Sequence, residues 1–313
     1  MPTPPSSWPE LAAEGYPFWL PTATTVRFGT GSSWTTKDLP AGSHVCALSL
    51  FGTDPAPGVT KQCDTSSASQ AAVLWKGDYE TGDFSQWWLQ EWSQNNSQSF
   101  TPSQVGNSAA TIVTAPTAQG SYAAKFQLLP NTGTSSVDRA EIVATQQEAG
   151  GYPGEDWYYG WWTDFPGPSQ QWWSRGGDWN DFTQFGSNDG SGGWLTFGVD
   201  DTSGTPQIFM DAPTGHYGLA NLQYDHWYHF VLHVKWSTDP SVGAFELWLD
   251  GSQAIPLTSA QTLKNTTVSS GPALTSPGVH ISEGIYRAAS PFTNTVVHDG
   301  LCRAATYAAA AGC

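Results

Sequence analysis

The sequence predicts an all-β fold, on three observations. Short runs of alternating apolar and polar residues recur along the chain, separated by clusters of Gly, Pro, Asn, Asp and Ser. Long amphipathic helical patterns are almost absent. Glycine and proline are abundant, with 33 and 22 copies in 313 residues, as many strands and tight turns require. A sandwich or a barrel fits this pattern.

Residues 1–72 are expected to form a small N-terminal β module that contains a disulfide. The region has its own cysteine pair, and the Ser/Ala-rich stretch DTSSASQAA (64–72) follows as a linker. Its segment FGTDPAPGVTKQC (51–63) resembles small β modules appended to secreted bacterial carbohydrate enzymes. The main domain is then predicted to cover residues 73–313.

The main domain contains a series of predicted strands, and one shows how its core would form. In WYHFVLHVKWS (227–237), every second residue from Tyr228 to Trp236 is apolar. Burial of this face contributes roughly 1.5–3 kcal/mol per large side chain. The other predicted strands are AATIVTA (109–115), YAAKFQL (122–128), DRAEIVAT (138–145), WYYGWWTDF (157–165), DFTQF (181–185), WLTFGVD (194–200) and AFELWLDG (244–251).

The four cysteines favour a secreted, extracellular protein. Of the three possible pairings, the two short-loop disulfides Cys46–Cys63 and Cys302–Cys313 are favoured over the others and over free thiols. The start MPTPPSSWPE lacks a basic and an apolar region, so it is interpreted as a mature N-terminus from which any signal peptide has been removed. No apolar run is long enough to span a membrane.

The charge balance excludes nucleic acid as a partner. The chain has 11 Lys and Arg against 27 Asp and Glu, a net charge of −16, and no basic stripe. Tryptophan is the other compositional signal, because its faces stack on sugar rings. About half of these tryptophans are expected in the core. The crowded set is Trp161, Trp162, Trp172, Trp173, Trp179 and Trp194.

Six segments, taken in order, resemble the jelly-roll polysaccharide lyases, particularly the heparin-lyase-I-like and glucuronan-lyase-like families and more distantly the alginate lyases. The resemblance covers roughly residues 73–302 and implies a concanavalin-like sandwich of two antiparallel sheets, with the substrate groove on the concave sheet. The segments are GDYETGDFSQW (77–87), DRAEI (138–142), EDWYYGWWTDFP (155–166), DFTQF (181–185), the hairpin WYHFVLHVKWS…ELWLDG (227–251) and GIYR…TVVHDG (284–300).

This resemblance implies β-elimination at a uronic acid. A base removes the proton from C5, donors neutralise the C6 carboxylate, and an acid protonates the departing O4. Arg139 of the R-x-E strand and Gln184 match the carboxylate-binding residues, and Tyr286 of the G-x-Y strand matches the proton shuttle. Gly284 is expected to leave open space beside Tyr286. The expected substrate-binding residues are Glu141, which would orient Arg139, and Asn180, Trp179, Trp194 and Ser282.

Two positions depart from the family pattern. Gly186 stands where the Q-x-H motif has its histidine, and Val143 replaces a second arginine. Tyr286 would therefore act as both base and acid, or a histidine would arrive from another strand. His216 in the loop APTGHYG is the first candidate, followed by the histidines at 229 and 233. The one-tyrosine mechanism predicts an alkaline optimum unless Arg139 is close, because the ordinary pKa of tyrosine is about 10.

No cofactor is expected for catalysis, although a structural Ca²⁺ would fit Asp78, Glu80 and Asp299, which lie in acidic segments at the two ends of the main domain. Turn-forming acids without a metal explain the same residues equally well. The expected partner is a polysaccharide, a polyuronate in the first instance, bound by a monomer.

Each proposed site residue also has a structural explanation. The Arg139–Glu141 pair would serve as a structural ion pair, Gln184 as a solvated strand residue and Tyr286 as a half-buried sheet aromatic.

Two other functions stay open. A glycoside hydrolase for a neutral glucan needs two paired carboxylates, but the E-x-D-x-x-E strand of such glucanases is absent. A non-catalytic carbohydrate-binding protein would use the same tryptophans.

Overall fold

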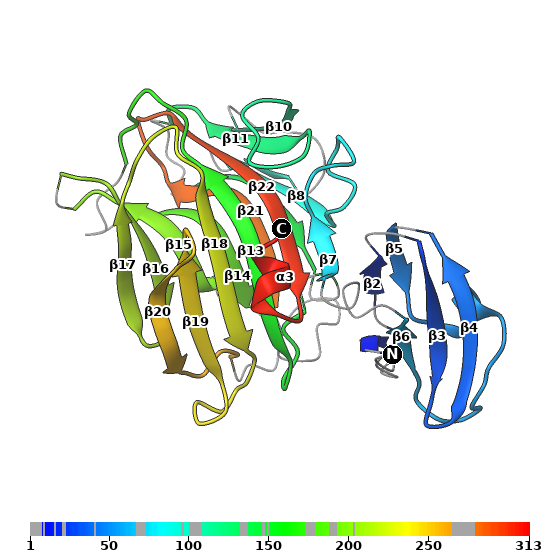
Figure 1. The fold of residues 1–313 in the computed structure, drawn as a ribbon. Helices are drawn as coiled ribbons and strands as arrows, with labels where there is room; N and C mark the ends of the chain where they lie inside the picture. Colours follow the sequence, from blue (N-terminus) through cyan, green and yellow to red (C-terminus); the bar gives the residue numbers. More distant parts are fainter. Residues whose placement is uncertain are drawn as a thin grey trace, which may run out of the picture.

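The computed structural model describes residues 8, 10–15, 17–20, 23–40, 42–66, 73–94, 97–99, 108–131, 137–145, 148, 150–172, 179–187, 193–202, 204–264 and 279–313. These residues form two lobes (Figure 1). The larger lobe stacks two antiparallel sheets face to face, and the smaller N-terminal lobe has sheets of its own. The described helices are two single turns, α1 (Leu48–Phe51) and α3 (Tyr307–Ala310). The predicted all-β jelly-roll sandwich is confirmed.

The first sheet of the sandwich has eight strands. Its order is β10-β11-β22-β13-β18-β19-β20, and β7 pairs with β22 beside this path. Strand β22 is buried along its whole length, because β11 and β7 flank it on one side and β13 on the other. The strands are β7 (Val73–Gly77), β10 (Ser108–Val113), β11 (Ala123–Leu128), β13 (Asp156–Asp164), β18 (Tyr228–Lys235), β19 (Ala244–Leu249), β20 (Ser252–Ser259) and β22 (Asn294–Ala304).

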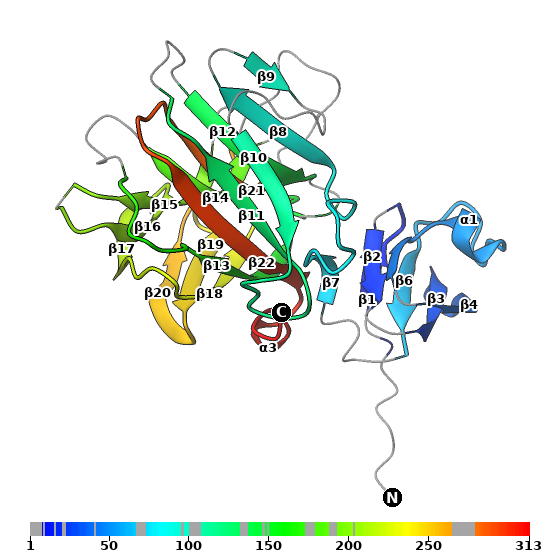
Figure 2. The same cartoon turned by 90° about the horizontal axis from the view of Figure 1, so that it is seen from above.

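The second sheet also has eight strands, in the order β17-β16-β15-β14-β21-β12-β8-β9. Strand β21, from the end of the chain, lies between β12 and β14 (Figure 2). Strand β14 has a bulge between Asp181 and Thr183. The strands are β8 (Leu89–Gln94), β9 (Ser97–Ser99), β12 (Val137–Ala144), β14 (Asn180–Ser187), β15 (Gly193–Asp200), β16 (Gln207–Ala212), β17 (Gly215–Asn221) and β21 (Val279–Ala288).

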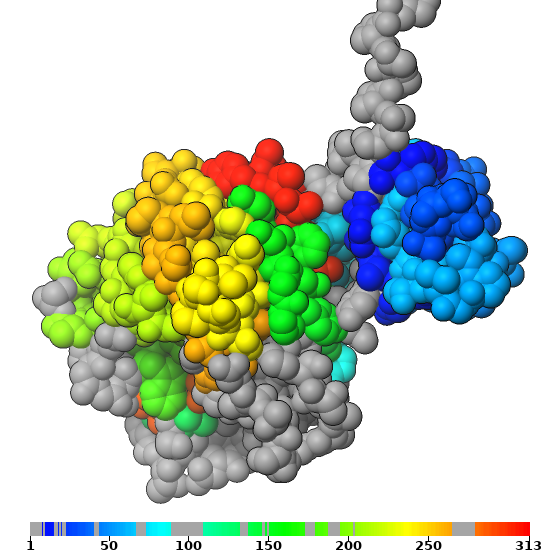
Figure 3. Space-filling model, turned by 90° about the horizontal axis from the view of Figure 1, so that it is seen from below, coloured from blue at the N-terminus to red at the C-terminus, as the bar shows by residue number. Residues whose placement is uncertain are grey.

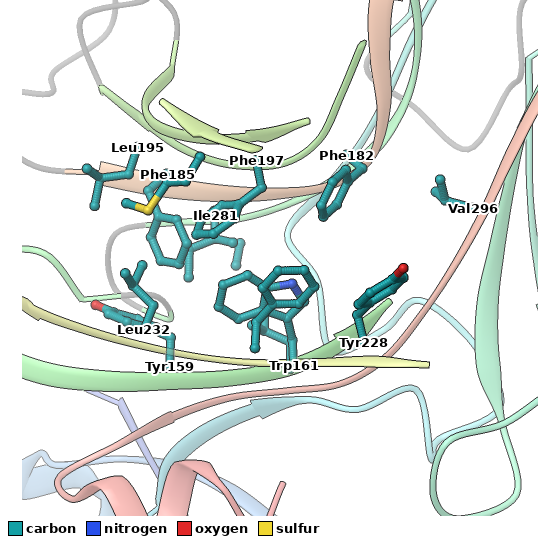
Figure 4. Close-up of a cluster of buried hydrophobic side chains, with 14 of the residues drawn as sticks. Tyr159, Trp161, Phe182, Phe185, Leu195, Phe197, Tyr228, Leu232, Ile281 and Val296 are labelled. Atoms are coloured by element: carbon teal, nitrogen blue, oxygen red, sulfur yellow. The ribbon is translucent and has the colours of Figure 1, made fainter. Parts of the chain in front are cut away.

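An aromatic core fills the space between the two sheets (Figure 4). Trp161 of the first sheet stacks on Phe230 and meets Phe197 of the second sheet edge-on, both with ring centroids 5.0 Å apart. Every second residue of β18 is buried, from Tyr228 to Val234, and Trp236 continues the row, as the alternation predicted. Trp161 and Trp172 therefore belong to the core rather than to a sugar-binding surface.

The N-terminal lobe has its own small core, which includes Leu11, Phe18 and Phe28. The order of its larger sheet is β1-β6-β3-β4, and β2 pairs with β5. It stands as a separate lobe beside the sandwich (Figure 3). The proposed boundary at residue 72 falls in 67–72, outside the described residues. The strands are β1 (Glu10–Ala13), β2 (Pro17–Leu20), β3 (Thr24–Thr30), β4 (Ser33–Leu39), β5 (Gly42–Val45) and β6 (Gln62–Thr65).

Both predicted disulfides are present. Cys46 pairs with Cys63 in the N-terminal lobe, and Cys302 of β22 pairs with Cys313 at the end of the chain. None of the described helices has the length and apolar character needed to cross a membrane.

Candidate functional site

The predicted site residues gather on three adjacent strands of the second sheet. Residues directly opposite one another in an antiparallel pair point to the same face. Tyr286 of β21 lies opposite Arg139 of β12, and Ser282 lies opposite Gln184 of β14. All four face away from the first sheet, on what we call the outer face. Arg287, the residue after Tyr286 on β21, points inward, where it is fully buried and pairs with Asp138 at 3.1 Å.

A chain of polar contacts joins Arg139, Glu141 and Gln184 across β21. Arg139 Nε lies 3.0 Å from Glu141 Oε2, and Gln184 Nε2 donates a hydrogen bond of 2.8 Å to Glu141 Oε1. The Arg139 guanidinium also covers the Tyr286 ring, with Cζ 4.1 Å from the ring centroid. Glu141 therefore holds both proposed carboxylate-binding side chains in place.

Tyr286 keeps its proton at neutral pH. Burial raises its pKa above the ordinary value of 10.0, and the nearby Glu141 and Asp181 raise it further. The charge of Arg139 and a hydrogen bond from it act in the opposite direction without reversing the shift. Trp179 packs against the Tyr286 ring at 5.4 Å. The arrangement suits a proton donor better than a base.

His280 is a candidate site residue that the sequence interpretation did not select. It lies opposite Gly186, two residues before Ser282 on the outer face of β21. A Cβ built on Gly186 would lie only 2.3 Å from His280 Nε2, so the imidazole fills space that the side chain of a Q-x-H histidine would enter. Burial, and then the charge of Arg139, lower the pKa of His280 to about 4. The imidazole is therefore neutral at pH 7 and able to accept a proton.

The signal for His280 was present in the sequence. Alternation places positions 280, 282, 284 and 286 on one face of β21, but the cross-strand pairing with Gly186 is not visible without the structure. His280 and Tyr286 are six residues apart, roughly 20 Å of strand rise. Arg139 contributes to the pKa shift of both groups, and its guanidinium lies directly over the Tyr286 ring.

The structure does not bring His216 to this cluster. His216 lies on the edge strand β17, four strands from β21. Its Nδ1 pairs with Asp211 Oδ1 at 2.9 Å, and its ring packs on Phe209. The other two candidate histidines, at positions 229 and 233, lie on β18 of the first sheet. His216 therefore lies apart from the cluster, whereas His280 lies on the same face as Tyr286 and is the candidate histidine of this site.

Asn180 and Trp194, two of the expected substrate-binding residues, are not found on a substrate surface among the described residues. Asn180 lies opposite the inward-facing Arg287, is 2% exposed and donates to the Val199 carbonyl oxygen at 3.1 Å, so it does not face a substrate. The bulge in β14 is the reason, because it reverses the alternation between Asn180 and Gln184. The side chain of Trp194 lies outside the described residues.

Gly284 does not provide clearance for a sugar ring. Its φ of +142° is one that side-chain-bearing residues rarely adopt, and a Cβ there would lie 2.1 Å from the Ala140 carbonyl oxygen of β12. The glycine is needed because the two strands approach closely at this point. Ser282 does lie on the outer face beside Gln184, and it is 3% exposed.

The proposed calcium ligands have protein partners. Burial raises the pKa of Asp299 to about 7, with smaller raising contributions from Glu80 and Asp78, and its Oδ1 is buried without a hydrogen-bond partner. However, no group of three or more His, Cys, Asp or Glu side chains in the described ranges is arranged to hold a metal ion. Calcium binding stays a prediction. The observed donors are Lys76 and Gln86 to Asp78, the Ser121 and Tyr122 amides to Glu80, and the Ala118 and Gln119 amides to Asp299.

Known proteins with the same architecture include an endo-β-1,4-glucuronan lyase from the fungus Trichoderma reesei. It superimposes with a TM-score of 0.52 at 17% identity, covering 76% of this chain and 98% of that protein, which shows a shared fold. The cellulose-induced protein Cip1 gives 0.47 at 19% identity, covering 74% and 97%. The catalytic domain of a glycoside hydrolase family 131 protein from Coprinopsis cinerea gives 0.48 at 12% identity, covering 74% and 94%.

The sequence model of the polysaccharide lyase family matches residues 79–301. This match begins just after β7, ends within β22 and includes β12, β14 and β21, the three strands that carry the outer-face cluster. Because the match covers more than half of the 313 residues, this chain belongs to the polysaccharide lyase family.

Proposed function

We propose that the protein is a secreted lyase that cleaves a uronic-acid-containing polysaccharide by β-elimination. The main support is the side-chain cluster on the outer face, where Arg139 covers the Tyr286 ring and Glu141 contacts both Arg139 and Gln184. His280 lies on the same face of β21, and burial lowers its pKa while it raises that of Tyr286, which suits a base and an acid. The two disulfides support a life in an oxidising compartment.

In the proposed reaction, Arg139 and Gln184 bind the C6 carboxylate of the sugar. Neutralising that carboxylate stabilises the negative charge that develops when the C5 proton leaves. His280 Nε2 accepts the C5 proton, and the electron pair of the C5–H bond becomes the C4–C5 double bond. The C4–O4 bond breaks, and O4 takes the proton of the Tyr286 hydroxyl. Proton exchange with water then returns His280 and Tyr286 to their starting states.

A second mechanism uses Tyr286 alone as base and acid. The six-residue separation of His280 and Tyr286 favours this alternative, because both groups must reach one sugar residue in the first mechanism. The raised pKa of Tyr286 opposes it, because a base must first lose its proton. The two mechanisms differ in pH dependence and in their response to changes at His280.

The hydrolase alternative needs two available carboxylates. On the described outer face of β12, β14 and β21, the carboxylates belong to Glu141 and Asp181, and both oxygens of Glu141 contact Arg139 or Gln184. This occupancy disfavours Glu141 as an acid or nucleophile.

Incubation with glucuronan, alginate, hyaluronan and heparin tests the proposed function. A lyase produces an unsaturated product with ultraviolet absorbance, in step with new reducing ends. Reducing ends without that absorbance would identify a hydrolase instead. Binding to the polymers without either product would identify a non-catalytic carbohydrate-binding protein.

A further inference from the structure

A pocket of about 510 Å³ lies where the N-terminal lobe meets the end of the sandwich. Strand β1 of the lobe forms one wall through Leu11 and Ala13. Leu74, the segment 152–157 and Arg303 of β22 form the other. In the space-filling view, the blue lobe lies beside the green β13 region and the red C-terminal residues (Figure 3). The size is typical of pockets for small molecules.

Arg303 is the unusual residue of this pocket. Its side chain is 6% exposed, and its Nε is buried without a hydrogen-bond partner. No salt bridge to the guanidinium is found among the described residues; the Trp157 ring lies 5.4 Å from Cζ, and Tyr159, Glu155 and Tyr152 interact with the guanidinium electrostatically. Burial lowers the pKa of Arg303, so these interactions offset the loss of hydration only in part. The buried Nε still lacks a hydrogen-bond acceptor, which an anionic group in direct contact would supply.

Three acidic residues line the pocket. Two of them, Glu155 and Asp156, are engaged by other groups, whereas burial and the nearby Asp64 raise the pKa of the third, Glu10. Glu155 Oε2 accepts hydrogen bonds from the backbone amides of Gly151 and Tyr152, at 2.8 and 3.0 Å. Asp156 Oδ1 lies 2.6 Å from His233 Nε2 on the outer side of the first sheet. Neither carboxylate lies within ion-pair distance of the Arg303 guanidinium. A direct hydrogen-bond acceptor for the Arg303 guanidinium is therefore left for a ligand to supply.

The remaining lining favours a sugar as the carrier of the anionic group. The indole Nε1 of Trp157 is a second buried donor without an acceptor. Leu11 and Leu74 supply apolar surface, and Tyr152 adds an aromatic side chain. An aromatic wall with a few directed donors fits the apolar face and the oxygen atoms of a pyranose ring. A guanidinium binds a carboxylate through two parallel hydrogen bonds.

We propose that this pocket is a second, non-catalytic binding site for a carboxylate-bearing saccharide, in which Arg303 pairs with the carboxylate and Trp157 contacts the sugar. The choice of an acidic sugar rests on the proposed function. The observation that Arg303 Nε and Trp157 Nε1 lack acceptors does not depend on that function. The N-terminal lobe supplies one wall, so its role is to complete a site that retains the polymer. The pocket is built at the end of the sandwich, away from the outer face that carries Tyr286.

The test is calorimetric titration of the full chain carrying Tyr286→Phe, which prevents turnover. Tetramers of β-1,4-linked glucuronate and of mannuronate serve as probes, and cellotetraose is the neutral control. Two binding events are expected with at least one acidic tetramer, and Arg303→Gln is expected to remove one of them. Because Arg303 is buried, Ala13→Trp provides an independent variant that fills the pocket from the N-terminal lobe. Thermal unfolding of each variant checks that it is folded.

The outcomes for this pocket and for the outer face are separable. Arg139→Ala is expected to remove the other event and leave the Arg303-dependent one. The pocket proposal is overturned if no acidic tetramer shows a second event, if cellotetraose binds the pocket equally well, or if folded Arg303→Gln and Ala13→Trp proteins keep both events. Absence of unsaturated product from the unmodified protein would overturn the lyase proposal and leave the Arg303 result standing.

Discussion

Replacement of Gly186 by alanine tests His280 sharply, because the glycine itself contributes no chemical group. A Cβ at position 186 would lie 2.3 Å from His280 Nε2, whereas ordinary van der Waals contact begins at 3.4 Å. The imidazole must therefore move by about 1 Å, which is the difference between these distances. The backbone of Gly186 does not have a positive φ, so alanine is compatible with the strand.

The expected loss of activity follows from this displacement. Misplacing a catalytic group by about 1 Å can cost on the order of 10²-fold in rate. Complete loss of a general base costs about 10²- to 10⁴-fold. We therefore expect Gly186→Ala to lower kcat about 10²-fold and His280→Ala to lower it at least as much. The double variant should match His280→Ala alone, because both changes act on the same imidazole.

The assay follows the absorbance of unsaturated product on the best polyuronate substrate. Gly218→Ala is the matched control, since Gly218 lies in β17 of the same sheet and the nearest atom to its added Cβ is 3.9 Å away. This control should keep the activity of the unmodified protein. If folded Gly186→Ala and His280→Ala proteins turn over at near-normal rates, His280 is not the base and the one-tyrosine mechanism is left.

Four other predictions concern the same site and the acidic segments. Tyr286→Phe should abolish product formation while oligosaccharide binding persists in calorimetry, and near-normal turnover would disprove the acid role of Tyr286. The pH profile of kcat/KM should rise as His280 loses its proton near pH 4 and fall only above pH 10, the ordinary pKa of tyrosine, where Tyr286 loses its own. A rate that instead climbs steadily through neutral pH would indicate Tyr286 as the base. Gln184→Ala should cost about 2.7–4 kcal/mol of transition-state stabilisation, measured as kcat/KM, if Gln184 acts like an oxyanion donor. Added Ca²⁺ should raise the Tm and Asp299→Asn should cancel the increase, whereas an unchanged Tm in the unmodified protein would refute a structural calcium site.

The all-β class, the apolar face of β18 and both disulfides were predictable because each rests on local pattern. Alternation needs only neighbouring residues, and the cysteine pairs are close in sequence. The grouping of Arg139, Gln184 and Tyr286 depends on pairing between distant strands, which the family resemblance supplied and the residues alone did not. His280 was missed because its partner Gly186 lies almost a hundred positions earlier in the chain, and no local feature reveals that register.

The bulge in β14 has a consequence for comparing or recombining proteins of this family. Because of the extra residue between Asp181 and Gln184, every later position of β14 faces the side opposite to the one that simple alternation predicts. Phe182 and Phe185, three positions apart, can therefore both enter the core while Gln184 stays outside. A chimera that joins this strand to a regular one must keep or lose the bulge and the extra residue together. If the strand became regular with the extra residue retained, Gln184 would turn inward and Phe185 would be exposed, whereas deleting one residue together with the bulge would leave both on their present faces.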